Sequence, residues 1–99
     1  MKKMFELPFL MLVHHQSIDL EAIPNPPDLE NDMAEKYMKK YLVLYKELAV
    51  AVYNNDEESI KSLRSHVSKI SSEGVKIQMK LDGKDTSKIA GWLIELYNY

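Results

Sequence analysis

Apolar side chains cover an unusually wide face of the stretch from residue 37 to 53. On a helix at about 100° per residue, they form two adjacent seams with 4-3-4-3 spacing. Together the seams span an arc of about 200°, twice the stripe typical of a surface helix. We therefore predict a helix over 29–53, capped by Asp28, at the centre of a bundle. The seams are Tyr37, Tyr41, Leu44, Leu48, Ala51 and Met38, Leu42, Tyr45, Ala49, Val52; the polar side is Lys39, Lys40, Lys46 and Glu47.

The next stretch, 56–81, carries one narrow seam, which is typical of a helix laid along a single partner. Between the two stretches, Asn54 and Asn55 favour a helix end in the left-handed conformation. Asn55 precedes Glu58 by three residues, as in a capping box. Because the turn is short, the two helices should lie antiparallel. Gly74 indicates either a close approach of the two helices or a kink. The seam is Ile60, Leu63, Val67, Ile70, Gly74, Ile77 and Leu81.

The flanking segments predict two shorter elements. A helix over 86–98, capped by Asp85 or Thr86, should follow Gly83 and pack on the second seam of the central helix. Residues 1–15 form an apolar segment that predicts a short helix starting near Pro8, with an extended arm or an export signal as alternatives. Residues 16–28 contain three prolines and predict a rigid, extended crossover.

Composition narrows the fold to one class. The 99 residues, 45% of them hydrophobic, fit one compact domain over 1–99. Sparse glycine and proline favour long helices, so we predict an all-α bundle built on a long antiparallel hairpin. The net charge of −2 and the scattered basic residues give no footprint for nucleic acid. The absence of cysteine suits the cytoplasm but leaves export open, and no run is long enough for a transmembrane helix.

No arrangement of residues predicts catalysis. His14 and His15 are adjacent and point in different directions, so they do not suit one metal ion. Ser65 and His66 are neighbours on a predicted helix and do not face each other. We therefore expect no enzyme activity, no metal site and no cofactor.

The tyrosines indicate a different role. Tyr37, Tyr41 and Tyr45 recur at i+4, and tyrosine is enriched where proteins bind one another. The first hypothesis is a protein–protein interaction module, possibly a homodimer, using this face or the apolar arm with Phe9, Leu10 and Leu12. Packing at the edge of the core, with the hydroxyls in water, is the alternative for the tyrosines. The alternative function is an exported or membrane-surface helical protein with an N-terminal anchoring segment.

Overall fold

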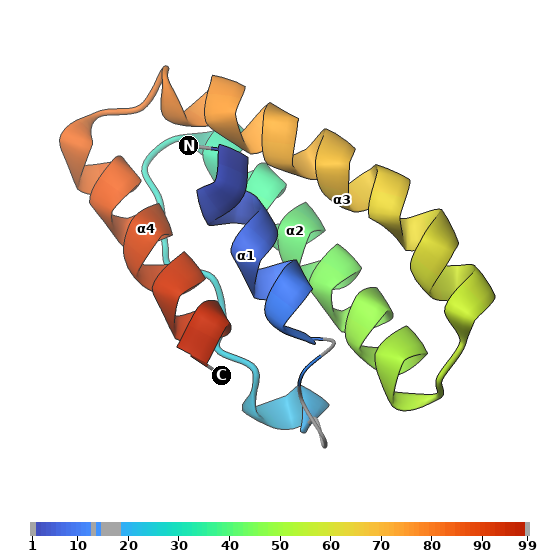
Figure 1. The fold of residues 1–99 in the computed structure, drawn as a ribbon. Helices are drawn as coiled ribbons and strands as arrows, with labels where there is room; N and C mark the ends of the chain where they lie inside the picture. The colour runs from blue at the N-terminus through green and yellow to red at the C-terminus, as the bar shows by residue number, and fades with distance from the viewer. Residues whose placement is uncertain (1, 13, 15–18, 99) are drawn as a thin grey trace.

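The computed structural model describes residues 2–12, 14 and 19–98 and has the predicted all-α fold, a small helical bundle (Figure 1). Four α-helices and a short 3₁₀ helix make up its regular structure, and the described residues include no strand. None of these helices is long and apolar enough to cross a membrane. The elements are α1 (Lys2–Leu12), η1 (Leu20–Ala22), α2 (Asp32–Tyr53), α3 (Glu57–Gln78) and α4 (Gly83–Asn98).

The predicted helical hairpin is present as α2 and α3, which lie antiparallel (Figure 1). The turn differs in detail from the prediction. Asn55 takes the left-handed conformation with φ 53°, and Asp56 rather than Asn55 caps α3. The Asp56 carboxylate accepts bonds from the backbone N–H and the hydroxyl of Ser59, at 3.2 and 2.6 Å. These bonds lower the pKa of Asp56, as expected when donors stabilise a carboxylate.

The centre of the bundle is α1, not α2 as predicted. It lies against α2, α3 and α4 and runs in the same direction as α2 and α4 (Figure 1). The helix begins at Lys2, well before the predicted start near Pro8, and Pro8 lies inside it. Pro8 has no N–H to donate to the Met4 carbonyl. Its ring is instead buried, together with Phe5, Phe9 and Leu12, so tertiary packing outweighs the lost helical bond.

The core holds a cluster of rings around Tyr41. The ring of Phe9 lies 4.6 Å from that of Tyr41, and the ring of Trp92 lies 5.6 Å away in an edge-to-face arrangement. Phe5 makes similar edge contacts with Tyr37 and Tyr41. Rings at these separations attract one another beyond their burial. The cluster therefore joins α1, α2 and α4 in one hydrophobic core.

Helix α3 has two buried faces, whereas its sequence predicted one. The predicted seam is present at Val67, Ile70 and Ile77. Ser71 and Gln78 are also buried, although neither belongs to the predicted seam. Gly74 explains the second face, because a Cβ built there would lie 2.8 Å from the Phe5 ring of α1 and would also overlap the Tyr37 hydroxyl. The atoms nearest to Gly74 thus belong to two aromatic side chains, and not to the backbone of α2 as a close approach of the two helices would require.

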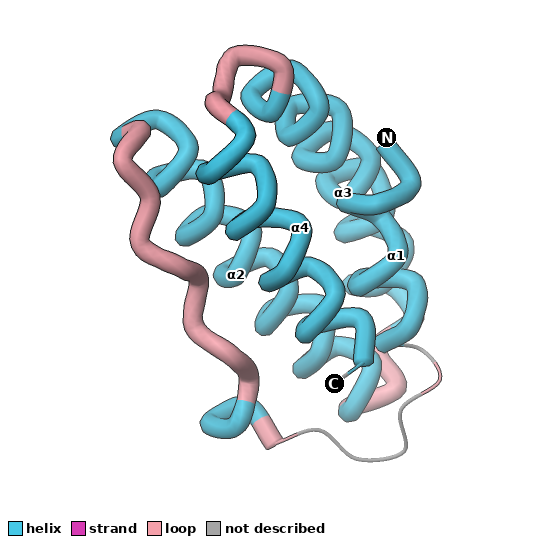
Figure 2. Tube along the Cα trace, turned by 90° about the vertical axis from the view of Figure 1, so that its left-hand side faces the viewer, coloured by secondary structure: helices cyan, strands magenta, loops and turns pink. Residues whose placement is uncertain are grey.

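The crossover, residues 19–31, begins with η1 and continues as an extended segment that returns the chain to the end of the bundle where α2 begins. It runs along the outside of the bundle beside α2 and α4 (Figure 2). Trp92 Nε1 donates to the Pro24 carbonyl at 3.0 Å, and Lys88 Nζ donates to the Asp28 carbonyl at 3.1 Å. Consequently α4 packs on α1 and the crossover and reaches α2 through long side chains such as Trp92. The predicted packing of α4 directly on α2 is wrong.

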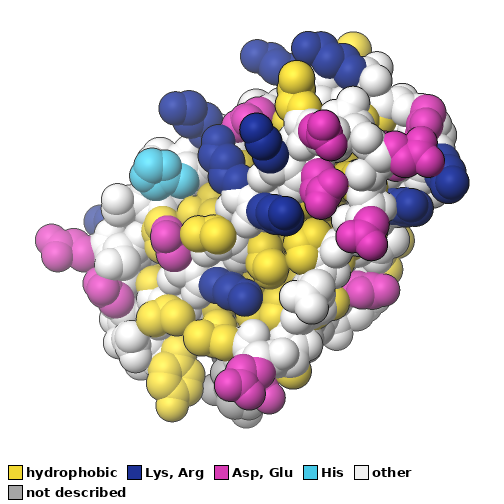
Figure 3. Space-filling model, turned by 180° about the vertical axis from the view of Figure 1, so that it is seen from behind, with side chains coloured by type: hydrophobic (Ala, Val, Ile, Leu, Met, Phe, Trp, Pro, Cys, Tyr) yellow, Lys and Arg dark blue, Asp and Glu magenta, His cyan; other side chains and the backbone are white. Residues whose placement is uncertain are grey.

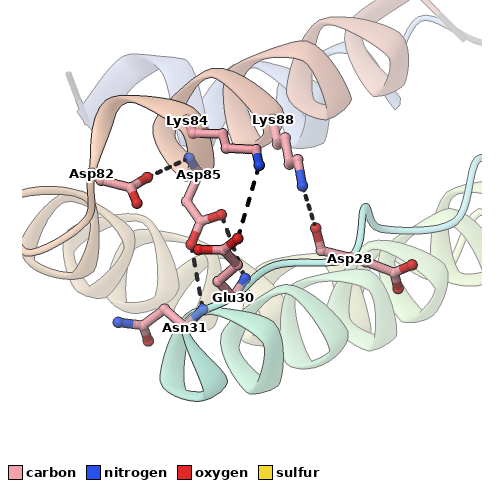
Figure 4. A network of polar contacts seen from close by, with 7 residues as sticks. All are labelled: Asp28, Glu30, Asn31, Asp82, Lys84, Asp85 and Lys88. Carbon is pink, nitrogen blue, oxygen red and sulfur yellow. Dashed lines mark hydrogen bonds and ion pairs between the residues drawn. The ribbon is translucent and has the colours of Figure 1, made fainter.

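A buried carboxylate fixes the end of this crossover (Figure 4). Asp85 in the first turn of α4 accepts the backbone N–H groups of Glu30 and Asn31, at 3.5 and 3.3 Å. Asn31 then caps α2, its side chain accepting the Ala34 N–H at 3.0 Å. The predicted cap, Asp28, lies three residues too early. Asp82 caps α4 through a 2.8 Å bond from the Asp85 N–H, so α4 begins at Gly83 rather than residue 86, and Gly83 has no positive φ.

Candidate functional site

The three tyrosines predicted to form an interface are all in the core. Tyr37 is 3% exposed, and Tyr41 and Tyr45 are fully buried. Tyr37 Oη donates to the Ile70 carbonyl of α3 at 2.6 Å, and Tyr41 Oη donates to the Phe5 carbonyl of α1. They therefore present no surface to a partner, and the hydroxyls of Tyr37 and Tyr41 are not in water as the edge-packing alternative required.

Burial also sets the ionisation of these tyrosines. Removal from water raises the pKa of Tyr37 and of Tyr41 far above the ordinary value of 10.0. The nearby Glu73 carboxylate adds to the effect at Tyr37, and the neighbouring tyrosines add to it at Tyr41. Both side chains are therefore neutral hydrogen-bond donors at physiological pH, which suits a structural role better than acid–base chemistry.

The predicted interface residues of the N-terminal segment divide into two groups. Phe9 and Leu12 are buried in the core, whereas Leu10 is 53% exposed. Leu10 lines a hollow between α1 and α3 together with Glu6, Ile60 and Arg64. Of the six predicted interface residues, only Leu10 is available on the surface of this chain.

The polar residues weighed as reactive groups remain separate. Ser65 Oγ donates to the Ser62 carbonyl one turn earlier at 3.0 Å, a common bond of serine on a helix. His66 is exposed on α3 and His14 is exposed after α1, while His15 lies outside the described residues. No group of three or more His, Cys, Asp or Glu residues in the described part of the chain is arranged to hold a metal ion.

A groove lies between α2 and α3, on the side away from α1. We call it the α2–α3 groove. Three hollows of about 350, 330 and 590 Å³ follow one another along it. The first two share Lys40 and Glu73, and the last two share Val43, Glu47 and Leu63. From Met33 to Asn54 the groove follows almost all of α2, which at 1.5 Å per residue is about 30 Å.

Apolar side chains of α2 are exposed along this groove. Met33, Val43 and Val50 are 60%, 57% and 42% exposed, and spacings of ten and seven residues place them on one face of the helix. On the opposite wall Leu63 is half-buried. An apolar stripe that its own chain leaves uncovered is typical of a binding surface.

Lysines line the same groove. Among the described residues, six lysines and three acidic residues border the three hollows, a net charge of +3, although the whole chain has a net charge of −2. Basic side chains gather toward one end of this face, with hydrophobic side chains exposed between the charged ones (Figure 3). The charged residues are Lys36, Lys40, Lys46, Lys69, Lys76, Lys80, Asp56, Glu47 and Glu73.

The sequence contained a signal for this groove that the initial interpretation missed. Val43 and Val50 lie seven residues apart on the side of the helix assigned to solvent because of Lys39, Lys40, Lys46 and Glu47. Two valines within a charged face at heptad spacing are unexpected for a purely solvated surface. The broad apolar arc on the other side of the helix obscured this weaker stripe.

A second, smaller apolar surface lies on the opposite side of the bundle, between α1 and α4. We call it the α1–α4 cleft. None of the described residues that line it is charged, and Leu7, Ile94 and Tyr97 are exposed at its surface. Its lining consists of Met4, Leu7, Pro8, Leu93, Ile94 and Tyr97.

Comparison of the chain with models of known protein families, with curated protein sequences and with solved structures found no match.

Proposed function

We propose that this protein is a non-enzymatic protein-binding module that receives a helix of its partner in the α2–α3 groove. The exposed stripe of Met33, Val43 and Val50 along α2 is the observation that carries the proposal. A groove about 30 Å long between two helices matches about 20 residues of a third helix. Amphipathic helices bind such grooves through apolar residues at i, i+3, i+4 and i+7.

A displayed library of 20-residue amphipathic helices tests this function. The unmutated chain should select binders, and the double variant Val43→Glu/Val50→Glu should lose them because two charges would enter the apolar stripe. Leu10→Glu, on the other side of the bundle, is the control and should keep them. Circular dichroism checks that each variant is folded. If no binder is selected, or if the groove variant binds as well as the control, the proposal is wrong.

Self-association through the α1–α4 cleft is a second candidate, favoured by the lack of charge in that cleft. In a symmetric dimer the same patch meets itself, so a charged lining would oppose its own copy. A lining without charge avoids this repulsion, whereas the lysines of the α2–α3 groove would face one another.

Sedimentation equilibrium at micromolar concentration tests the dimer. The unmutated chain should have twice the monomer mass, and Ile94→Glu should return it to the monomer mass. Val43→Glu, in the other groove, should leave the dimer intact. A monomer mass for the unmutated chain would contradict self-association and leave the binding of a helix in the α2–α3 groove unaffected.

A further inference from the structure

We propose that the α2–α3 groove selects an acidic amphipathic helix, whose acidic residues lie at the end where α2 begins and α3 ends. The inference rests on the proposed function of the groove and specifies the chemistry of the partner. Three observations support it: the distribution of charge along the groove, the lysines without an ion pair to a described residue, and the apolar floor between them.

The charges of the groove are concentrated at one end. Among the described residues, the hollow at that end is bordered by Lys36, Lys40, Lys76 and Lys80 and by one carboxylate, that of Glu73. The hollow at the other end has one lysine, Lys46, against two carboxylates. An acidic segment would therefore be attracted to the first end and gain nothing at the second. This polarity fixes where the acidic part of a bound helix lies.

Most lysines at the basic end are not engaged within the chain. Lys40 bridges to Glu73 across the groove at 3.2 Å. Lys36, Lys76 and Lys80 form no ion pair with another described residue. Three ammonium groups around one hollow repel one another unless an anion joins them. Carboxylates on a partner would supply that anion.

The floor between these lysines suits a side chain rather than a free ion. Met33 and Ile77 line it, and Met33 is exposed. Methionine adapts to different apolar partners, and the lysine stems add apolar walls while their ammonium groups stay in water. An apolar floor with a basic rim complements a helix that has apolar residues on one face and carboxylates beside them.

A helix fits the groove better than an anionic membrane does. The basic end is only part of the face, because Glu47 and Asp56 border the same groove farther along. A flat anionic surface that reached the lysines would also approach these carboxylates and be repelled. A single helix seated in the groove can place its acidic residues beside the lysines alone.

The experiment uses the full chain and a displayed library of amphipathic helices that share one apolar face. Flanking positions are randomised among Glu, Gln and Lys. Selected binders should be enriched in Glu at one end. In fluorescence anisotropy a selected peptide should bind about tenfold more tightly than its version with Gln at those positions, since two to four exposed ion pairs each add a small factor to the affinity. High salt should reduce the difference.

Charge reversal tests whether the acidic residues of the peptide bind at the basic end of the groove. Lys36→Glu/Lys80→Glu should abolish the preference for Glu, whereas the matched control Lys3→Glu/Lys61→Glu, at exposed positions outside the groove, should keep it. Glu73→Gln removes the one carboxylate that the described residues contribute to the basic hollow and should tighten binding of the acidic peptide about two- to fivefold.

The outcomes separate this inference from the function on which it rests. Binders without a charge bias, or with Lys in place of Glu, overturn the acidic partner but leave the groove as a binding site. Failure to select any binder overturns both. A third outcome is that the chain co-sediments with anionic phospholipid vesicles, that Lys36→Glu/Lys80→Glu abolishes this, and that acidic peptides are not preferred. This outcome would assign the lysines to membrane binding and overturn the proposal.

Discussion

At the scale of single residues, Gly74 and Gly91 differ in the space that surrounds them, and this difference decides whether a side chain could be added. Both lie inside helices, where glycine is less favourable than alanine by about 1 kcal/mol. At Gly74 the missing side chain leaves room for Phe5 and Tyr37, whereas at Gly91 nothing lies within 4 Å of an added Cβ. Of these two positions, Gly74 is therefore the one at which the surrounding packing requires glycine.

Gly74→Ala should destabilise the protein by about 1–3 kcal/mol, because the added methyl group overlaps the buried Phe5 ring and forces the core apart. Gly91→Ala should stabilise it by about 0.5–1 kcal/mol through helix propensity. Urea denaturation measures both free energies of unfolding. Equal midpoints for the two variants would contradict the close packing of α1 on α3.

The buried tyrosines predict sensitivity to alkaline pH. The pKa values of Tyr37 and Tyr41 are raised in the folded protein, so above pH 10 the unfolded chain loses protons that the folded protein retains. Stability is therefore complete below this pH and should fall above it by about 1.4 kcal/mol per pH unit for each tyrosine. Urea midpoints measured from pH 9 upward check this, and Tyr37→Phe should reduce the slope. A slope unchanged by that substitution would contradict the prediction for Tyr37.

At the scale of elements, periodicity predicted the long helices, and the starts of the two shorter helices, α1 and α4, were predicted too late. The seam through Val67, Ile70 and Ile77 identified α3, and the Asn54-Asn55 turn identified the hairpin. In α1 the eleven residues are interrupted by Pro8, so local signals placed the start of the helix too late. The caps at Asn31 and Asp82 were missed because the chain offers several Asp and Asn residues near each helix start, and local sequence does not rank them.

The Asp85 contact is the element-scale feature that best explains how the crossover is held. Asp85→Ala should cost about 1–3 kcal/mol, because it leaves the N–H groups of Glu30 and Asn31 without their acceptor. Lys84→Ala removes only an exposed ion pair with Glu30 in the same network and should change stability by less than about 1 kcal/mol. Thermal unfolding measures the loss of stability in each variant relative to the unmutated chain. Similar losses in both would mean that the buried carboxylate does not fasten the crossover.

At the scale of the whole molecule, the sequence predicted a bundle but not its packing order. An apolar face predicts that a helix is covered, but it does not identify the element that covers it. Tyr37, Tyr41 and Tyr45 could have faced a partner, and they face α1 and α3 instead. The candidate site was missed for the complementary reason, because Val43 and Val50 form a weak stripe beside a much stronger one.

The central position of α1 predicts that the bundle depends on it. Deleting residues 1–12 would expose the apolar surfaces of α2, α3 and α4 together and should cause aggregation or loss of the cooperative thermal transition. Replacing Leu10 by serine in the full chain is the control, because Leu10 is exposed and should alter the melting temperature little. Differential scanning calorimetry compares the two. A truncated chain that melts like the full one would show that α1 is dispensable.

The order in which the helices are synthesised gives the central helix a further consequence. On the ribosome α1 is made before all three helices that cover it, and α4 is the last of them. At about 5–20 residues per second, α1 remains without its full cover for several seconds. Before α2 and α3 are made, Phe5 and Phe9 lack their packing partners on those helices, so chaperones and other factors that recognise nascent apolar segments can bind α1. Completion of the bundle removes that access.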